Sequence, residues 1–554
     1  MNLLRSFLGT KELSPPLPKD GREALAHTLA SAVGMHVYPP SITALRGVIF
    51  FLGRRGRRKW LGLIYRGASP DAVHFSGEER EIELDQPLTL RLCPTNHANA
   101  ATVRHMLPFT APKVLGILKS VGCGDRLGLA TPGHVRAVRR AIRPGFSVST
   151  QSSHSGQTGM APIFAQQSIR EMARTERTPD QVMDDATWGV FQEGWCEGFG
   201  ADADHLKTTA DVDLCVGAGF TLYTVDPGDH VDNAASADTV GTLVEKFAAL
   251  PWAVLESSPQ EVRATYLGKA FDLGDGVVIR FPNETLLRAA AKYGRAVAHA
   301  AAMYRHLAGR MGNPASGQGF ELEVSVDETE TPTTPEEHFF VASELKRLGV
   351  RWVSLAPRFV GRFEKGVDYI GDLEEFEADL ARHVAVARAL GPYKLSIHSG
   401  SDKFSIYPII ARVAGDWVHL KTAGTSYLEA LRAVAATDPA LFREILAFAE
   451  AGYATDKATY HVSADPRRFP DPDRLADDQL AGVLDTFDGR QLLHVTFGSV
   501  LTAHDDSGGY RFRDRLLEAL SADEEGYYAL LEAHIGRHLA PFTTGGLLKT
   551  RGTR

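Results

Sequence analysis

Residues 320–328 read FELEVSVDE, and this stretch decides the fold class. Its alternation places Glu321, Glu323 and Ser325 on one face of a strand and three aliphatic residues on the other. On an antiparallel sheet the polar face would simply contact water. Inside a small closed barrel the same face points into a packed interior, where unpaired carboxylates are very unfavourable. In a barrel these carboxylates must therefore meet cations or a metal.

Similar apolar runs that end in polar residues recur along the chain, and with 320–328 there are eight. The other seven lie at 126–132, 160–168, 200–208, 220–227, 352–359, 394–402 and 417–425. Helical patterns separate most of them, for example at 336–348 and 373–390. Strands alternating with helices indicate a parallel sheet, and eight repeats predict an α/β fold of the (β/α)₈ TIM-like barrel type. An open doubly wound sheet is the alternative.

The remaining segments are predicted to surround this barrel. The predicted parts are an N-terminal β-containing lead-in at 1–115, the barrel at 116–430 with a helical insertion at 233–315, and a mostly helical region at 431–554. The insertion suits a lid or a homo-oligomer contact. The basic stretch 54–59 joins two strand-like runs and is predicted to be a solvated hairpin tip, with a polyanion-binding site as the alternative. One more strand-like run lies at 492–500.

Composition excludes several classes of protein. The chain has 554 residues, 60 Lys+Arg against 68 Asp+Glu, and 44% hydrophobic residues, as in a soluble globular protein. This mildly acidic balance argues against nucleic-acid binding. No apolar stretch reaches about 18 residues, so no membrane span is expected. Four cysteines without CxxC spacing exclude a disulfide framework, and the expected location is the reducing cytoplasm.

The carboxyl ends of barrel strands converge on one face, where active sites are built. Polar residues at the ends of the eight runs include Gln166, Gln167, Asp204, His205, Lys207, Asp226, Glu321, Glu323, Asp327, Arg358, His398, Asp402, Lys403, His419 and Lys421. Imidazoles and carboxylates suit a divalent cation such as zinc, manganese or nickel, and the cationic side chains suit an anionic substrate. Each histidine also has the alternative of being a hydrogen-bonded core residue.

The alternation of side chains along a strand decides which of these polar residues are able to point into the barrel. His205 and Lys207 share one face of their strand, so both are able to point into the barrel. Asp204 then points away, unless the strand is already broken at that position. His398 and His419 fall on two runs that we expect to be neighbouring strands.

Other motifs give weaker evidence for a functional site. The glycines at 122–124 do not continue at the dinucleotide spacing, and neither a P-loop nor a GxSxG elbow occurs, so no nucleotide cofactor is expected. His534 and His538 stand four residues apart on a predicted helix without a third ligand, and we expect them on a solvated face.

Several long strings resemble the tagaturonate/fructuronate epimerase family over residues from about 160 to 430. They are FAQQSIRE, GADADHLKT, GFTLYTVDP, FELEVSVDETETPTTPEEH, SLAPRFVGRFEKGVDYIGD, KLSIHSGSDKFSIYP and HLKTAGTSYLEAL. The resemblance implies an isomerase that uses a divalent metal and interconverts two hexuronate ketoses in bacterial hexuronate catabolism. Alternatives are a neutral ketohexose 4-epimerase for fructose and tagatose, a metal aldolase, and a noncatalytic sugar-acid binding protein.

The resemblance also implies roles for individual residues. His205, His398 and His419 look like metal ligands, and Asp204 and Glu323 resemble the acid–base pair. The expected substrate contacts are Gln167, Lys207, Glu321, Arg358, Lys403 and Lys421, of which the cationic side chains are candidates for holding the uronate carboxylate.

The chemistry limits the mechanism. The two ketoses differ at C4, which is β to the C2 carbonyl, so simple enolisation would act on the C3 hydrogen instead. Three routes remain for inverting C4. They are hydride transfer at C4, two successive enolisations, and retro-aldol cleavage of the C3–C4 bond. We expect metal-assisted retro-aldol chemistry, with a Schiff base at Lys421 as the alternative.

Overall fold

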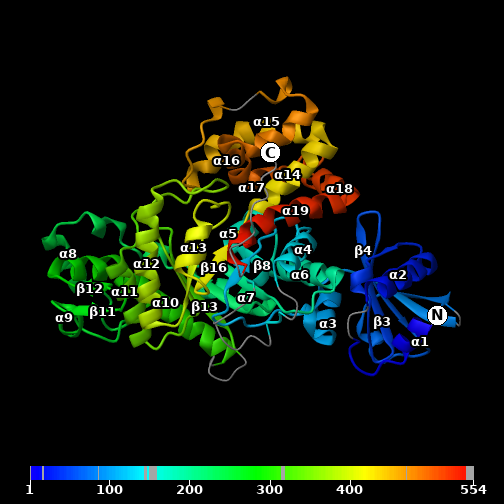
Figure 1. Ribbon diagram of the computed structural model, residues 1–554, viewed down its shortest axis with the longest axis horizontal. Helices are drawn as coiled ribbons and strands as arrows, with labels where there is room; N and C mark the ends of the chain where they lie inside the picture. Colours follow the sequence, from blue (N-terminus) through cyan, green and yellow to red (C-terminus); the bar gives the residue numbers. More distant parts are fainter. Residues whose placement is uncertain are drawn as a thin grey trace.

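A closed barrel of eight parallel strands forms the centre of the molecule (Figure 1). The computed structural model describes residues 2–14, 18–84, 87–142, 146–148, 159–312, 319–468 and 471–543. The barrel strands follow one another in chain order and are β7 (Ser120–Gly122), β8 (Ala161–Ser168), β9 (Gly200–Leu206), β10 (Leu222–Val225), β13 (Glu321–Val326), β14 (Ser354–Pro357), β15 (Lys394–Ile397) and β16 (Val418–Lys421). The barrel expected from the sequence is confirmed, and so is the adjacency of β15 and β16.

The first barrel strand lies earlier in the chain than predicted. Residues 126–132 form a loop and the start of helix α4 (Thr131–Ala141), so the prediction of a strand there is wrong. The Asp125 carboxylate accepts hydrogen bonds from the backbone N–H groups of Leu127, Gly128 and Ala130, which holds this loop in place. Pro132 then stands at the start of α4, where its missing N–H is not needed.

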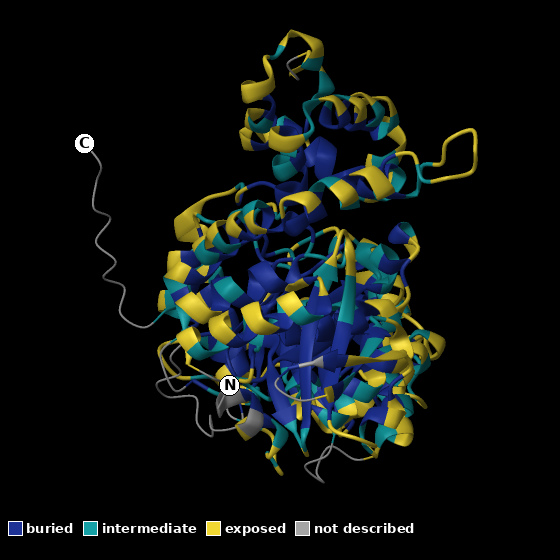
Figure 2. Cartoon of the chain, turned by 90° about the vertical axis from the view of Figure 1, so that its right-hand side faces the viewer, coloured by how far each residue is buried: buried dark blue, intermediate teal, exposed yellow. Residues whose placement is uncertain are grey.

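Helices cover the outside of the barrel, with buried residues on the side of the strands and exposed residues on the outer side (Figure 2). They include α5 (Ile169–Thr175), α6 (Pro179–Glu193), α7 (Thr209–Ala218), α11 (Pro335–Arg347), α12 (Leu373–Leu390) and α13 (Tyr407–Val413). Thr178, Thr208 and Thr334 begin three of these helices with capping boxes, in which the third helical residue bonds back to the cap. Local sequence thus fixes where each of these helices begins.

The N-terminal segment is a six-stranded antiparallel sheet beside the barrel. Its elements are α1 (Asn2–Leu8), α2 (Lys19–Val33), β1 (His36–Val37), β2 (Thr43–Leu45), β3 (Val48–Arg55), β4 (Arg58–Tyr65), β5 (Glu78–Glu83), β6 (Pro87–Pro94) and α3 (His97–Met106). The predicted β3–β4 hairpin is confirmed, but its basic residues are not simply solvated. Arg54 and Lys59 both form ion pairs with Glu524 of the C-terminal region.

The insertion between β10 and β13 contains helices and a small sheet. Its elements are α8 (Val240–Ala248), α9 (Pro259–Tyr266), β11 (Ala270–Asp272), β12 (Val278–Arg280) and the long α10 (Asn283–Met311). The predicted helices are present, whereas the β11–β12 pair was not predicted. Residues 313–315 of the predicted insertion lie outside the described residues.

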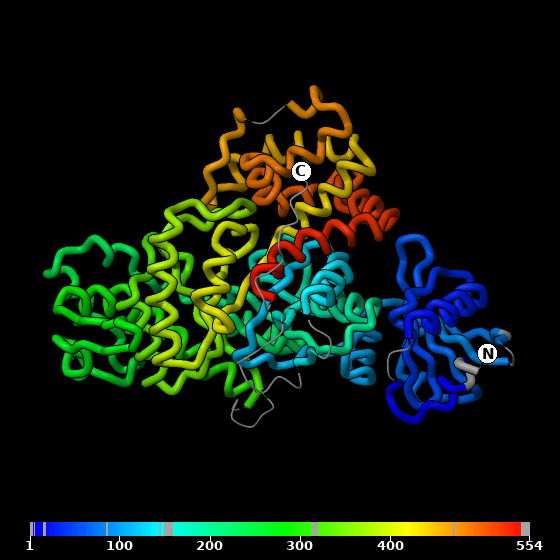
Figure 3. Tube along the Cα trace, viewed as in Figure 1, coloured from blue at the N-terminus to red at the C-terminus, as the bar shows by residue number. Residues whose placement is uncertain are grey.

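The C-terminal region lies across the mouth of the barrel (Figure 3). Its helices are α14 (Thr425–Thr437), α15 (Pro439–Asp456), α16 (Phe487–Val495), α17 (Phe497–Thr502), α18 (Arg513–Ala522) and α19 (Glu524–Leu539), and α19 packs against α4. The prediction of a strand at 492–500 is wrong, because these residues belong to helices α16 and α17, whose apolar side chains form a core of the C-terminal region. Residues 544–554 of this predicted region lie outside the described residues, and its boundary at 431 stays a prediction.

None of the helices in the described ranges is long and apolar enough to cross a bilayer. The four cysteines are all unpaired thiols.

Glu524 links the N-terminal sheet to α19, and its replacement is expected to destabilise the protein. It is 8% exposed, accepts a hydrogen bond from the Tyr38 hydroxyl at 2.7 Å, and faces Arg54 Nε at 3.3 Å and Lys59 Nζ at 3.6 Å. Glu524→Gln should lower the free energy of unfolding by about 1–3 kcal/mol, measured by urea denaturation, because two cations lose their carboxylate.

The neighbouring Glu525→Gln is the matched control. Its side chain is 72% exposed and pairs with Arg136, so its loss should lower the free energy of unfolding by less than about 1 kcal/mol. Equal urea midpoints for the two variants would contradict a structural role for Glu524.

Candidate active site

Strand β9 is irregular at the two residues that the sequence analysis could not place together. Tyr223 of β10 pairs with Ala203, and Val225 pairs with Leu206. Asp204 and His205 therefore both stand opposite Thr224, and His205 adopts a left-handed φ of 52°. Such a bulge changes the direction in which a side chain points. The strand is thus broken where parity required it, and both side chains line the same cavity.

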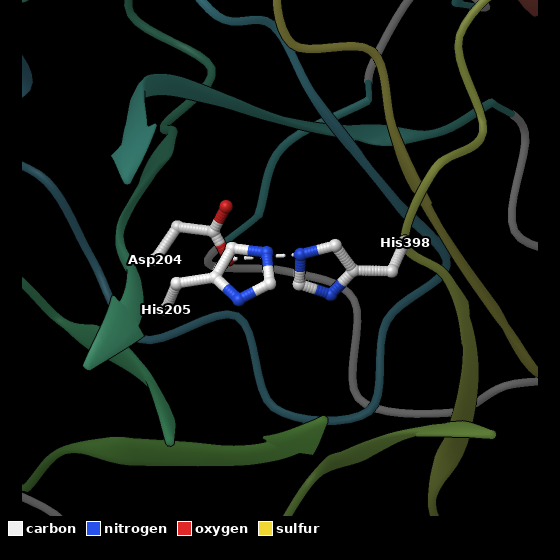
Figure 4. Close-up of side chains that lie close together, drawn as sticks. All are labelled: Asp204, His205 and His398. Atoms are coloured by element: carbon white, nitrogen blue, oxygen red, sulfur yellow. Dashed lines mark ion pairs between the residues drawn. The ribbon is translucent and has the colours of Figure 1, made fainter. Parts of the chain in front are cut away.

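Two imidazoles face one another at this point (Figure 4). The ring centroids of His205 and His398 are 4.3 Å apart. The Nδ1 of His205 lies 3.1 Å from Asp226 Oδ2, and the Nδ1 of His398 lies 3.2 Å from Ser325 Oγ. Each ring is held from behind, which leaves the Nε2 atoms for a ligand.

These nitrogens form a candidate metal-binding group with Asp204. The donor atoms of Asp204, His205 and His398 lie within 4.8 Å of one another, and His398 Nε2 is 3.4 Å from Asp204 Oδ1. That buried Nε2 has no hydrogen-bond partner in the described ranges. A second carboxylate, Glu328, lies 3.8 Å from His205 Nε2. An unpartnered imidazole nitrogen beside carboxylates fits a divalent cation.

Below the histidines, one ammonium group is shared by three buried carboxylates. Lys421 Nζ lies 2.9 Å from Asp202, 2.7 Å from Asp204 and 3.0 Å from Glu323. Burial alone would raise the pKa of Asp204, but the charge of Lys421 holds it well below its usual value. The negative charges of the three carboxylates in turn hold the pKa of Lys421 well above its usual value despite burial. Asp204 is therefore held in its ionised form.

Two adjacent cavities lie above these groups. The inner one, of about 40 Å³, is lined by Asp204, His205, His398, Lys403, Lys421, Gln166, Arg126, Glu171 and His494, among others. The outer one, of about 480 Å³, is lined by Arg358, Arg362, Glu364, Asp327, Glu328 and His461, among others. Arg170, Lys365, His398, Ser399 and Tyr460 line both cavities. The two cavities therefore adjoin one another at the barrel mouth.

Some of the expected substrate contacts reach this site without being free to bind. Lys403 lines the inner cavity but donates to the carbonyls of Glu364, Val367 and Ser401 at 2.6–2.9 Å, which uses all three of its protons. Burial lowers the pKa of Lys403 to about 7.

Arg358, in contrast, is free to bind. It lines the outer cavity, and its guanidinium has no hydrogen bond or ion pair with the described part of the chain.

Five of the expected site residues do not line either cavity as described. They are Gln167, Lys207, Glu321, Glu323 and His419. Gln167 accepts a hydrogen bond from Arg177 instead, and Gln166 takes the place facing Asp204. Lys207 pairs with Asp229 at 2.7 Å on the outside.

Three of these five lie deeper in the barrel, Glu323 in the cluster around Lys421 and the other two further from the mouth. Glu321 begins β13 and accepts a hydrogen bond from the Gly116 backbone, at the end opposite the mouth, where burial raises its pKa to about 7. His419 bonds Ser120 Oγ through Nδ1 at 2.9 Å, and burial lowers its pKa to about 3.

The sequence profile of the tagaturonate epimerase family matches residues 38–542. The chain belongs to this family. A relative from Thermotoga maritima, named tagaturonate/fructuronate epimerase, is 40% identical over 506 residues, 91% of this chain and 96% of that protein. Family membership makes the chain an epimerase, an enzyme of the isomerase class.

Solved structures agree with this family assignment. The fructuronate-tagaturonate epimerase UxaE from Cohnella laeviribosi, in a glycerol complex, has a TM-score of 0.83 and 38% identity, covering 95% of this chain and 99% of that one. Its native form has a TM-score of 0.82. The resemblance expected for residues from about 160 to 430 is confirmed and extends over most of the chain.

Several site residues of this epimerase were missed by sequence reasoning. Arg126, Arg170, Glu171, Glu328, Lys365, Tyr460 and His494 line the cavities from loops, from the barrel helix α5 and from the C-terminal helix α16. Strand ends were the signal used to find candidates, and these residues do not lie in strands. Arg170, Glu171, Glu328 and Lys365 stood inside the family-like strings FAQQSIRE, FELEVSVDETETPTTPEEH and SLAPRFVGRFEKGVDYIGD, but no role was assigned to them.

His534 and His538 of the epimerase are buried, so their expected solvated face is wrong. Asp402 Oδ1 lies 3.1 Å from His534 Nε2, and Asp402 Oδ2 lies 2.9 Å from Arg490. His538 donates from Nδ1 to the His534 carbonyl and accepts the Asp402 N–H at Nε2. Because both nitrogens of His538 are used and Arg490 neutralises Asp402, this group is a structural network that ties α19 to the loop after β15.

Removing the shared ammonium group should destabilise the barrel strongly. Lys421→Met leaves three buried carboxylates without their cation, so the free energy of unfolding should fall by about 3–5 kcal/mol in urea denaturation with chelator present. Lys207→Met is the control, since its side chain is 42% exposed and its ion pair contributes less than about 1 kcal/mol. Unfolding of both variants at the same urea concentration would show that Lys421 is not needed for stability.

Proposed function

We propose that this epimerase interconverts D-tagaturonate and D-fructuronate by inverting C4, with a bound divalent cation. The observation that carries the proposal is the pair of facing Nε2 atoms of His205 and His398 beside Asp204, at the floor of the inner cavity. The named activity of the Thermotoga and Cohnella relatives supports the substrate pair.

His205 and His398 would hold the cation, together with a carboxylate from Asp204 or Glu328. When bound, such a cation supplies Lewis acidity toward the oxygens of a ketose. Asp226 and Ser325 orient the two rings through their Nδ1 atoms. His419 lies outside this group of donor atoms, so we do not assign it as a ligand.

We propose retro-aldol cleavage as the route, because C4 carries the β-hydroxyl of the ketose. Asp204 takes the proton of O4, the C3–C4 bond breaks with its electron pair moving to C3, and O4 becomes the aldehyde oxygen. The aldehyde turns its other face to C3, the bond forms again, and O4 regains a proton. Asp204 is assigned this step because its carboxylate lines the inner cavity beside the facing imidazoles.

Glu323 has a more distant part in this proposal. It is fully buried and shares Lys421 with Asp204, at 3.0 Å and 2.7 Å respectively. We therefore propose that Glu323 acts through Lys421: its negative charge offsets part of the positive charge that the ammonium group presents to Asp204.

Metal analysis tests the proposed cation site directly. Chelator-treated enzyme should lose at least about 100-fold of its activity on D-tagaturonate and recover it with added Mn²⁺ or Zn²⁺. His398→Ala should lose the bound metal, measured by elemental analysis after dialysis, whereas His419→Ala should retain it. Full activity of demonstrably metal-free enzyme would exclude the proposal.

Isotope exchange tests the bond that breaks. With ¹³C-labelled dihydroxyacetone present, label should enter C1–C3 of the hexuronates, since cleavage between C3 and C4 produces this three-carbon unit. In D₂O neither C3 nor C4 should gain deuterium from solvent. Deuterium at C3 would instead indicate successive enolisations, and accumulation of free fragments in place of the epimer would indicate an aldolase.

A further inference from the structure

A histidine from the C-terminal region reaches the inner cavity through a slot between two glycines. His494 of α16 lines the cavity and is 1% exposed. Gly366 and Gly424 flank it, both with left-handed φ, of 74° and 91°. A Cβ on Gly424 would lie 2.7 Å from His494 Cε1, and one on Gly366 would lie 3.4 Å from its Nδ1. Only small, left-handed residues leave room for this imidazole.

The contacts of His494 fix its tautomer. Arg126 Nη2 lies 3.4 Å from His494 Nε2, and because a guanidinium only donates, Nε2 accepts. Burial, with the charges of Arg126 and Lys365, holds the pKa of His494 well below its usual value, so the ring is neutral. The single proton therefore sits on Nδ1. Within the described ranges this buried Nδ1 has no hydrogen-bond partner.

The cations of the inner cavity differ in whether they are already paired. Arg126 pairs with Glu171, and Arg170 pairs with Glu328 at 2.8 Å. Lys421 and Lys403 are held by carboxylates and carbonyls as described above. Lys365 Nζ contacts the neutral Ser399 Oγ at 3.0 Å and forms no ion pair with the described residues. Lys365 is thus the inner-cavity cation that has no carboxylate or carbonyl partner of its own.

We propose that Lys365 and the Nδ1–H of His494, on either side of Gly366, bind the carboxylate of the sugar acid. A carboxylate only accepts hydrogen bonds and carries one negative charge, which matches one unpaired ammonium group and one unpartnered donor. This inference rests on the proposed function, because it assumes a sugar-acid substrate. It makes both residues determinants of specificity for uronates over neutral ketoses.

Binding of an unreactive pair of ligands tests the lysine. D-Gluconate has a carboxylate and no ketone, and D-glucitol is its neutral counterpart. By titration calorimetry, Lys365→Met should weaken gluconate binding about 10- to 100-fold and leave glucitol binding within about 3-fold. Arg358→Met tests the unpaired guanidinium of the outer cavity as the rival carboxylate-binding group and should weaken gluconate less than about 3-fold. Equal weakening of both ligands by Lys365→Met, or a gluconate-specific loss in Arg358→Met, would overturn the assignment.

Two amide replacements test the histidine. His494→Asn places an amide N–H near the position of Nδ1, whereas His494→Gln places it near Nε2. Asparagine should keep gluconate affinity within about 3-fold, and glutamine should weaken it about 10-fold, with unchanged urea midpoints in both. Equal affinities of the two variants would contradict a donor role for Nδ1. Because gluconate does not react, these results stand apart from turnover of D-tagaturonate, whose absence would reject the proposed function alone.

Discussion

The ion cluster around Lys421 is the interaction on which the active end of the barrel depends. Three carboxylates converge below the histidine pair, and without a cation their burial would be prohibitively unfavourable. The ammonium group of Lys421 forms ion pairs with all three of them, Asp202, Asp204 and Glu323. The pKa of Asp202 still rises to about 6, through burial that Lys421 only partly offsets. The balance of charge therefore leaves Asp204 as the ionised member that faces the cavity.

The bulge in β9 is the second constraint, because it converts a strand of alternating direction into a site. A regular strand would have sent Asp204 and His205 to opposite faces. Placing both opposite Thr224 lets a carboxylate and an imidazole from adjacent positions reach the same cavity. The left-handed φ of His205 is the local strain that accompanies this arrangement.

Most of the barrel could be predicted from the sequence, since seven of its strands are apolar runs with polar ends. The eighth, β7, has only three residues, Ser120–Gly122, which is too short to leave a recognisable pattern. Residues 126–132 look like a strand because Leu127, Leu129 and Ala130 are apolar, yet these side chains pack against the C-terminal helices. Periodicity reports that a side chain is buried but does not report against which element.

The same limit applies to the site. Asp204, His205 and His398 were found because strand ends must converge in a barrel. Lys365 and His494 come from a loop and from a helix of another region, and only tertiary packing brings them to the cavity. The burial of His534 and His538 likewise depends on Asp402, a residue far away in the sequence that no spacing rule connects to them.

The position of α16 over the barrel mouth has a consequence for the order in which the working enzyme comes into being. Ribosomal synthesis proceeds from the N-terminus, so all eight strands emerge before the helix that carries His494. The barrel strands therefore leave the ribosome before the helix that lies over their carboxyl ends. Under the role proposed for His494, the carboxylate-binding part of the site is complete only once α16 has been synthesised and has packed over the barrel mouth.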